Sequence, residues 1–280
     1  MSTFGDFPAK FRNPRTAKIA ILPVPYDGTS TYGKGADKGA AAILAASYQL
    51  ENYDIETKTE VYKHGIYVEK AVAERRSPEK MTAAVEKHVG DILKKNKFVV
   101  LLGGEHSVTP GSVRAHAKKY KDLTVLQLDA HTDMRDEYHG SKNNHACAMA
   151  RIKEFNPVQV GIRSLDVGEM KNIALDRVFF AKDIHDNDAW MEKAIAKLGK
   201  NVYVTIDLDV FDPAFLPSTG TPEPGGLDWY MVARFLKRVV MKRTVIGFDV
   251  VELLPRKEAP ASDFLAAKLV HSFLSYIFAK

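Results

Sequence analysis

The sequence TVLQLDAHTDMRDEYHG, from Thr124 to Gly140, decides the fold and shows where polar side chains gather. It begins as a run of β-branched and leucine residues, which predicts a buried strand, and the run ends in Asp129, His131 and Asp133. These three residues occupy alternate positions, so on an extended chain their side chains point to the same side. Hydrophobic burial does not explain such an ending. The pattern therefore predicts a strand whose carboxyl end carries metal ligands.

The composition is that of an ordinary globular protein. The chain has 280 residues, of which 45% are hydrophobic and 27% charged, and this suits a single domain spanning residues 1–280. The net charge of +5 comes from 40 basic and 35 acidic residues scattered along the chain, with no basic block long enough to follow a phosphate backbone. We therefore expect no nucleic acid partner.

The chain carries no sequence signal for secretion or membrane insertion. Cys147 is the only cysteine, which excludes an internal disulfide and suits a reducing compartment. The N-terminal segment MSTFGDFPAKFRNPRTAK lacks the apolar centre of a signal peptide. No later apolar run approaches the ~20 residues that a membrane span needs. These features predict a cytoplasmic protein with no membrane partner.

Short apolar runs alternate with helical patterns along the whole chain. The runs predict strands at Lys18–Val24, Phe98–Gly104, Val158–Arg163, Arg177–Lys182 and Thr244–Leu253, and in the stretches that begin at Thr124 and Asn201. The other patterns predict helices at Ala41–Leu50, Pro110–Tyr120, Ala146–Phe155, Ala189–Leu198, Trp229–Lys242 and Phe264–Phe278, and one that starts after Ser77. Continuous apolar strands between helices predict an α/β fold, a three-layer α/β/α sandwich with a mainly parallel central sheet.

Four of the predicted strands end in polar clusters. The clusters are GGEHS with His106, DAHTD with Asp129, His131 and Asp133, DLDVFD with Asp207 and Asp209, and FDVVE with Asp249 and Glu252. Taken singly, each has an ordinary explanation, since an acidic pair can cap a loop and a lone histidine is often structural. In a parallel sheet, however, the carboxyl ends of the strands share one edge. The four clusters together therefore predict one metal site.

The types of ligand in these clusters limit the choice of metal. Carboxylates and imidazoles without a nearby thiolate suit Mn²⁺ better than structural zinc, with Fe²⁺, Co²⁺ and Ni²⁺ as further possibilities. Four aspartates and two histidines exceed what one ion needs. Two ions about 3.5 to 4 Å apart would lower the pKa of a shared water toward neutrality and so provide a hydroxide nucleophile.

The same motifs resemble those of the ureohydrolase family, which includes arginase and agmatinase. The run TIDLDVFDPAFLPSTGTPEPGG adds to GGEHS and DAHTD, and the likeness extends from PYDGTSTYGKGADKGAAAILAAS to AAKLV. The chain is most similar to agmatinases. The resemblance implies two Mn²⁺ ions per subunit, hydrolysis of a guanidino group to urea and an amine, and a homotrimer or homohexamer. It also implies that one ion takes His106, Asp129, Asp133 and Asp207, and the other takes His131, Asp129, Asp207 and Asp209, so that Asp129 and Asp207 are bridges.

The resemblance further implies roles for residues outside the ligand set. His145 matches the histidine that passes a proton to the leaving amine, and Glu252 matches the acid that binds the guanidinium. Asp249, in the same motif, is either a support for a ligand or a buried, paired acid. We expect Asp166 and Arg135 to contact the rest of the substrate, with Asp136 and Glu137 as further acids that could attract a distal ammonium.

The sequence leaves the guanidino substrate open. Arginases have an asparagine where this chain has Arg135, which weakens arginine as the substrate, and the N-terminal block is most like that of agmatinases. Hydrolysis of agmatine to putrescine and urea is therefore the first prediction. The alternatives are aminopropylagmatine, arginine, and 4-guanidinobutyrate if Arg135 faces the pocket, or a non-catalytic metal-binding protein of the same fold. A deacetylase of related fold is disfavoured because no His-His pair occurs.

Overall fold

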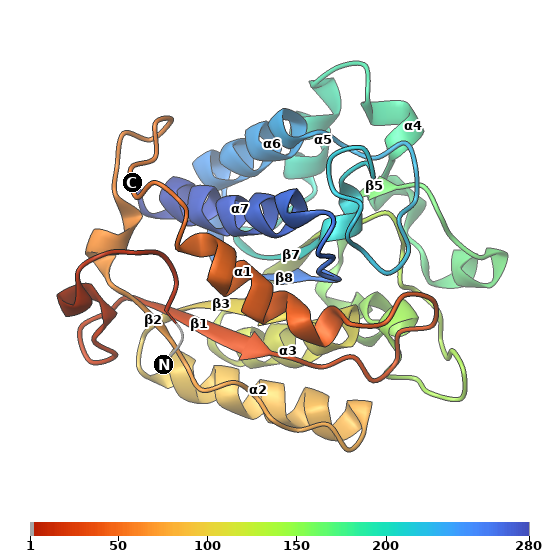
Figure 1. The fold of residues 1–280 in the computed structure, drawn as a ribbon. Helices are drawn as coiled ribbons and strands as arrows, with labels where there is room; N and C mark the ends of the chain where they lie inside the picture. The colour runs from red at the N-terminus through yellow and green to blue at the C-terminus, as the bar shows by residue number, and fades with distance from the viewer. Residues whose placement is uncertain (1–2, 280) are drawn as a thin grey trace.

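The computed structural model describes residues 3–279, and eight strands in this part of the chain form one sheet (Figure 1). In chain order the strands are β1 (Ile19–Val24), β2 (Ile66–Val68), β3 (Phe98–Gly103), β4 (Leu123–Leu128), β5 (Val158–Ile162), β6 (Val178–Phe180), β7 (Asn201–Asp207) and β8 (Thr244–Val251). Their order across the sheet is β2-β1-β3-β8-β7-β4-β5-β6, and every neighbouring pair is parallel. The predicted parallel sheet is confirmed.

Helices cover both faces of this sheet. Side chains from α1 (Gly39–Ser47), α5 (Ala189–Ala196), α6 (Trp229–Lys242) and α7 (Pro260–Phe278) pack into one apolar cluster with the strands. On the opposite face, α2 (Pro78–Lys94) and α3 (Thr109–Lys119) pack against each other and the sheet. Figure 1 shows α1, α6 and α7 on one side and α2 and α3 on the other. The α/β/α sandwich predicted from the sequence is confirmed.

Burial on both faces explains why the strands read as continuous apolar runs. All six residues of β1 are buried. Ile19 and Ile21 belong to the cluster that contains α7, whereas Ala20 and Leu22 belong to the cluster that contains α2. Successive side chains of a strand point to opposite faces, so a strand covered on both sides needs an apolar residue at every position.

Two helices start where their capping residues predict. The Ser77 hydroxyl accepts a hydrogen bond from the Lys80 amide at 3.3 Å, and Pro78 occupies the first turn of α2. The Asp228 carboxylate accepts one from the Met231 amide at 2.7 Å at the start of α6. Each cap satisfies an amide that the helix itself leaves without an acceptor.

The helix predicted at Ala146–Phe155 is wrong. The segment forms three short 3₁₀ helices, η5 (His145–Cys147), η6 (Met149–Arg151) and η7 (Lys153–Phe155). The amides of Met149 and Ala150 donate to the Asp133 carbonyl at 3.0 and 3.1 Å rather than to carbonyls four residues earlier. Long-range hydrogen bonds to the loop after β4 therefore replace the α-helical pattern.

Smaller differences between the predicted and the observed elements lie at the edge strands of the sheet and at the ends of helices and strands. Strand β2 was not predicted, because three residues are too few for a periodic signal. Strand β6 ends at Phe180, since Ala181 begins the short helix α4 (Ala181–Ile184). Helix α1 begins at Gly39, where a Cβ atom would lie 2.6 Å from the Leu253 carbonyl oxygen, so only glycine fits against that strand end.

The remaining described elements are short 3₁₀ helices in the connections. They are η1 (Ala9–Arg12), η2 (Ala36–Lys38), η3 (Val61–His64), η4 (His106–Val108), η8 (Val167–Asn172), η9 (Leu175–Arg177) and η10 (Leu208–Val210). Within residues 3–279, no helix combines the length and the apolar character needed to cross a membrane.

Candidate metal centre and active site

The predicted clusters meet at the carboxyl edge of the four central strands β3, β8, β7 and β4. Asp207 is the last residue of β7, Asp129 follows β4 directly, and Glu252 follows β8 directly. His106 begins η4, shortly after β3 ends. Because these strands are parallel neighbours, residues more than a hundred positions apart in the sequence share one site.

The first group of ligand atoms surrounds His106. Its Nδ1 atom lies 3.1 Å from Asp129 Oδ2, 3.0 Å from Asp133 Oδ2 and 3.3 Å from Asp207 Oδ2. His106 is fully buried, and within residues 3–279 its Nδ1 atom has no hydrogen-bond partner. A buried nitrogen facing three carboxylate oxygens is suited to bind a cation between them.

The second group surrounds His131. Its Nδ1 atom lies 2.9 Å from Asp209 Oδ2 and 3.7 Å from Asp129 Oδ1. Asp129 belongs to both groups, one oxygen facing each histidine, so its carboxylate is placed to bridge two ions. Asp207 lies with the first group through Oδ2, while its Oδ1 atom accepts the Asp209 amide at 2.9 Å.

Burial and the repulsion of neighbouring charges leave Asp129 and Asp207 in need of positive charge. Burial, followed by the charge of Asp209, raises the pKa of Asp129 to about 7, and the same two causes raise the pKa of Asp207 well above its usual value. Burial alone would lower the pKa of His106, but the neighbouring carboxylates raise it well above its usual value. Cations relieve this repulsion. The donor set and its charge fit two divalent ions.

A hydrogen-bonded chain fixes the orientation of the His106 ring. Its Nε2 atom lies 2.9 Å from the Thr205 hydroxyl, which in turn lies 2.5 Å from Asp249 Oδ1. Asp249 is fully buried and also accepts the Tyr203 and Thr109 hydroxyls. Since the Thr205 proton goes to Asp249, Thr205 accepts from Nε2, and Nδ1 is the ring atom that faces the carboxylates and would bind a cation in place of its proton. Asp249 is therefore buried and paired, and it orients the candidate ligand His106.

We expect Thr205→Val to weaken manganese binding by about 10-fold to 100-fold, the usual cost of losing a partner that orients a metal ligand. The variant keeps the side-chain volume but leaves the His106 Nε2 proton without an acceptor. Equilibrium titration with Mn²⁺ measures the effect, and Thr205→Ser is the control that keeps the hydroxyl. Equal affinities of the valine and serine variants would contradict this role.

Two of the site residues have left-handed backbone conformations. Asp133 has φ 51° and Glu252 has φ 64°, values that non-glycine residues adopt infrequently. Hydrogen bonds hold both: the Asp133 carbonyl accepts two amides, and the Glu252 amide donates to the Gly104 carbonyl at 2.8 Å. The surrounding structure therefore imposes a conformation that brings these carboxylates into the site.

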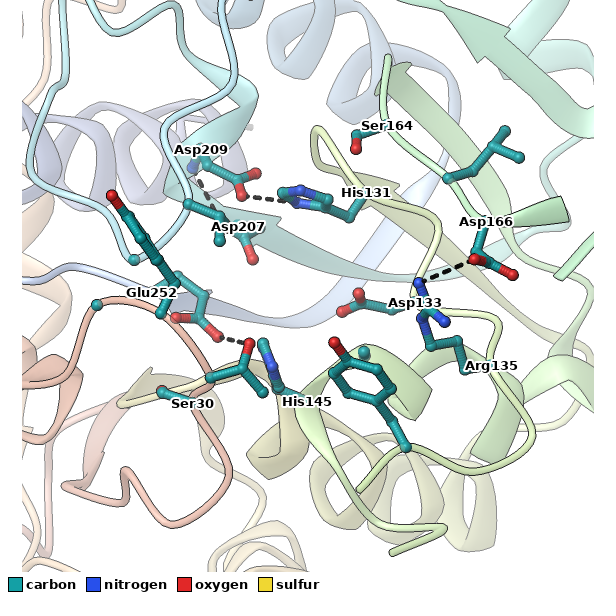
Figure 2. A pocket seen from close by; sticks show the side chains of 18 of the residues that line it. Ser30, His131, Asp133, Arg135, His145, Ser164, Asp166, Asp207, Asp209 and Glu252 are labelled. Atoms are coloured by element: carbon teal, nitrogen blue, oxygen red, sulfur yellow. Dashed lines mark hydrogen bonds and ion pairs between the residues drawn. The ribbon is translucent and has the colours of Figure 1, made fainter. Parts of the chain in front are cut away.

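His145 and Glu252 lie together beside Asp133 and Asp207, two of the candidate metal ligands (Figure 2). His145 Nδ1 is 3.7 Å from Glu252 Oε1, and this same oxygen accepts the His106 amide at 2.8 Å. Burial by itself lowers the pKa of His145, but the nearby Glu252 carboxylate outweighs burial and the pKa rises to about 9. The Nε2 atom is buried and, in the part of the chain described, has no hydrogen-bond partner.

A cavity of about 270 Å³ opens over these residues. His131, Asp133, Asp207 and Asp209 line its floor with His145 and Glu252 beside them. Arg135, Asp166, Glu169 and Tyr138 line another part of the wall, and Tyr32 and Leu165 also line it and are largely or partly exposed. The cavity thus joins the metal-binding residues to the protein surface.

Arg135 lines the cavity and also pairs with acids. Its guanidinium lies 3.4 Å from Glu169 and 3.6 Å from Asp166, and it stacks over the Tyr138 ring at 4.6 Å. Figure 2 shows Arg135 beside Asp166, across the cavity from Glu252. Asp136, by contrast, does not line the cavity. Its carboxylate pairs with Lys171 at 2.5 Å.

Glu137 is exposed and does not line the cavity either. Of the three acids expected to attract a distal ammonium, the structure therefore brings only Asp166 to the cavity wall.

Several supporting residues were not predicted from the sequence. Gln127 donates to Asp129 Oδ2 at 2.6 Å, and Gln159 donates to the Gln127 side-chain oxygen at 2.6 Å. Glu169 is buried and accepts the Met134 amide at 3.1 Å and the Thr132 hydroxyl. The available signal was a glutamine inside each of two apolar strands, since a buried polar side chain there needs a partner.

Comparison with known proteins agrees with this geometry. The model of the Arginase family matches residues 17–275. The chain belongs to this family. Family members depend on a binuclear metal centre, and the chain is a hydrolase of guanidino compounds. The ureohydrolase resemblance stated from the motifs is therefore confirmed.

Individual relatives match over nearly the whole chain. An N(1)-aminopropylagmatine ureohydrolase of Synechocystis is 39% identical over 93% of this chain and 89% of its own. An agmatinase of Pyrococcus horikoshii is 32% identical over 91% and 90%. The crystal structure of an agmatine ureohydrolase of Thermoplasma volcanium superposes with a TM-score of 0.87 at 32% identity, covering 95% of this chain and 92% of that one.

Proposed function

We propose that this protein releases urea from a guanidino compound with a cationic tail, and that its substrate is N(1)-aminopropylagmatine. In this reaction water adds to the guanidinium carbon, and the bond from that carbon to the alkyl nitrogen breaks. The alkyl nitrogen leaves as an amine after it gains a proton. The site must therefore supply an activated water, hold the guanidinium and deliver a proton.

The metal pair provides the first requirement. His106, Asp129, Asp133 and Asp207 would hold one ion, and His131, Asp129, Asp207 and Asp209 would hold the other. Bound there, two divalent ions, of which Mn²⁺ suits the ligands best, activate a water near neutral pH and stabilise negative charge as it develops. Asp129 faces both groups of ligands and so supports this arrangement.

Glu252 provides the second requirement. Its carboxylate lines the cavity beside the metal-binding residues and is nearly buried, so it can accept charge-assisted hydrogen bonds from a guanidinium with little competition from water. The backbone of Glu252 and the His106 amide fix its position. We assign Glu252 to guanidinium binding.

His145 provides the third requirement. Its Nε2 atom is buried at the cavity without a partner among residues 3–279, and Glu252 stabilises the protonated ring from the Nδ1 side. A protonated imidazole in this position can donate to the leaving nitrogen. His139, the other histidine of this loop, is exposed and lies outside the cavity lining.

The charge of the cavity favours a cationic tail. Arg135 is the only lysine or arginine among the described residues that line it, and Asp166 and Glu169 already face its guanidinium. A substrate carboxylate would have to compete with both acids for Arg135. This observation carries the proposal, because it disfavours 4-guanidinobutyrate and arginine and leaves substrates whose far end is an amine.

The relatives support aminopropylagmatine, which is longer than agmatine, as the substrate. The sequence predicted agmatine first and aminopropylagmatine as an alternative. Four similar proteins, 34% to 39% identical, are N(1)-aminopropylagmatine ureohydrolases, whereas the agmatinases compared are 32% identical. Asp166 is half-exposed at the cavity wall, where its carboxylate can attract the one additional ammonium group of the longer substrate.

The test is urea release from aminopropylagmatine, agmatine, 4-guanidinobutyrate and arginine by the Mn²⁺-loaded protein. We expect kcat/KM to be highest for aminopropylagmatine, about 10-fold above agmatine from the added contacts, and lowest for the two carboxylates. A preference for agmatine would contradict the assignment of the longer substrate. A preference for a carboxylate would contradict the role given to Arg135, and no urea from any compound would contradict the proposed reaction.

A further inference from the structure

The hydroxyl of Thr29 joins two distant parts of the site. Thr29 lies in the loop after β1, and its Oγ1 atom accepts the backbone amide of His145 at 2.9 Å. The same hydroxyl donates to Glu105 Oε1 at 2.9 Å, and the Thr29 amide donates to that oxygen at 3.3 Å. A hydroxyl that gives its proton to a carboxylate has lone pairs left for an amide. The direction of the chain is therefore His145 to Thr29 to Glu105.

Glu105 provides a fixed end for this chain. It is fully buried, precedes His106 directly and caps η4 by accepting the Ser107 amide at 2.8 Å and the Ser107 hydroxyl at 2.9 Å. Its two oxygens thus accept from four donors of Thr29 and Ser107. In the proposed reaction this buried carboxylate neither binds substrate nor holds an ion. Glu105 lies in the same turn as His106, a candidate metal ligand.

The backbone of His145 needs such an anchor because its ring is loosely held. Nδ1 lies 3.7 Å from Glu252, beyond ordinary hydrogen-bond distance, and Nε2 has no partner in residues 3–279. On the backbone side, Asn144 caps η5 and donates to the Thr29 carbonyl at 3.5 Å. The Thr29 hydroxyl makes the shorter contact of the two. The backbone position of His145 therefore sets where its ring lies.

We propose that Thr29 and Glu105 are positioning residues that hold His145 at the distance from the leaving nitrogen that proton transfer requires. The inference rests on the proposed function, since it takes His145 as the proton donor. The hydrogen bonds from His145 through Thr29 to Glu105 connect His145 to the turn that carries His106. They therefore keep the proton donor at a fixed position relative to the candidate metal ligands. Neither Thr29 nor Glu105 lines the cavity, so both act through His145.

The experiment compares Thr29→Val, Thr29→Ser, His145→Ala and the double variant Thr29→Val/His145→Ala, all loaded with Mn²⁺ and assayed for urea release. We expect Thr29→Val to lower kcat about 10-fold to 100-fold, the cost of misplacing a catalytic group by ~1 Å. KM and bound manganese should stay near the wild-type values. Thr29→Ser should keep kcat, because serine retains the hydroxyl.

The double variant separates positioning from general structural damage. If Thr29 acts through His145, adding Thr29→Val to His145→Ala should leave the residual kcat unchanged, since residues that act as a unit are not additive. An equal loss in both backgrounds would overturn the inference, as would an unchanged kcat in Thr29→Val. Failure of the proposed function is distinct, because the wild-type protein would then release no urea.

A second variant covers the case in which Thr29→Val does not fold. Glu105→Gln keeps the size of the side chain but turns one acceptor oxygen into an amide donor that faces other donors. We expect the same loss of kcat at wild-type manganese content, and no loss in the His145→Ala background. Wild-type kcat in Glu105→Gln would overturn the inference.

Discussion

Asp129→Asn is expected to lower urea release by about 10³-fold or more, the several kcal/mol that metal activation of water contributes. Asp129 faces both His106 and His131, at 3.1 Å and 3.7 Å, so the loss of its charge affects both groups of ligands. Asparagine keeps the shape of the side chain and so limits damage to packing. Bound manganese should fall together with activity.

The measurement for Asp129→Asn is urea release together with the metal content of the purified protein. Asp176→Asn is the matched control, because Asp176 is an exposed acid next to the edge strand β6 and pairs with Lys197 at 2.7 Å. It should keep wild-type activity and metal. Wild-type turnover by Asp129→Asn would show that the bridging assignment is wrong.

Glu252→Gln is expected to lower kcat/KM by about 10²-fold to nearly 10⁴-fold, since removing one charge of a buried ion pair costs ~3 to 5 kcal/mol. The substrate guanidinium would lose its counter-charge, and protonated His145, 3.7 Å away, would lose the group that stabilises it. The glutamine oxygen can still accept the His106 amide, so the turn of η4 should remain in place.

The two variants are distinguished by their metal content. Glu252 belongs to neither group of ligand atoms found in residues 3–279, so Glu252→Gln should bind manganese as the wild-type protein does. Low activity with full metal content would support its role in substrate binding. Loss of manganese from Glu252→Gln would instead place this residue among the supports of the metal site.

The meeting of the candidate metal ligands could be predicted from the sequence because each of them lies at the end of a strand or shortly after it. Asp129 and Asp207 follow apolar runs that read plainly as strands, and a parallel sheet brings such ends to one edge. No long-range information was needed beyond the order in which strands and helices alternate. The sheet edge and its ligands were therefore predicted together.

The supporting contacts could not be predicted in this way because they depend on register and loop paths. Thr205 reaches Asp249 because β7 and β8 pair with these two residues opposite each other. Thr29 reaches Glu105 across 76 positions of the chain. A sequence pattern records neither the register of two strands nor the path of a loop.

Long-range contacts also account for the wrong helix and for the uncertainty over Arg135. The segment after His145 has helical composition, but the Asp133 carbonyl takes two of its amides. Arg135 finds its partners in a loop about thirty residues further along, at Asp166 and Glu169. The sequence predicted that Arg135 contacts the substrate, and the structure shows it lining the cavity and paired with acids at once.

The central claim is that two ions share Asp129 and together support hydrolysis of a guanidino group. The most direct test titrates the metal-free protein with Mn²⁺ while urea release from aminopropylagmatine is measured in parallel. We expect two ions to bind per subunit, with activity rising as the second ion binds. Full activity with one ion per subunit, or two bound ions without urea release from any guanidino compound, would contradict it.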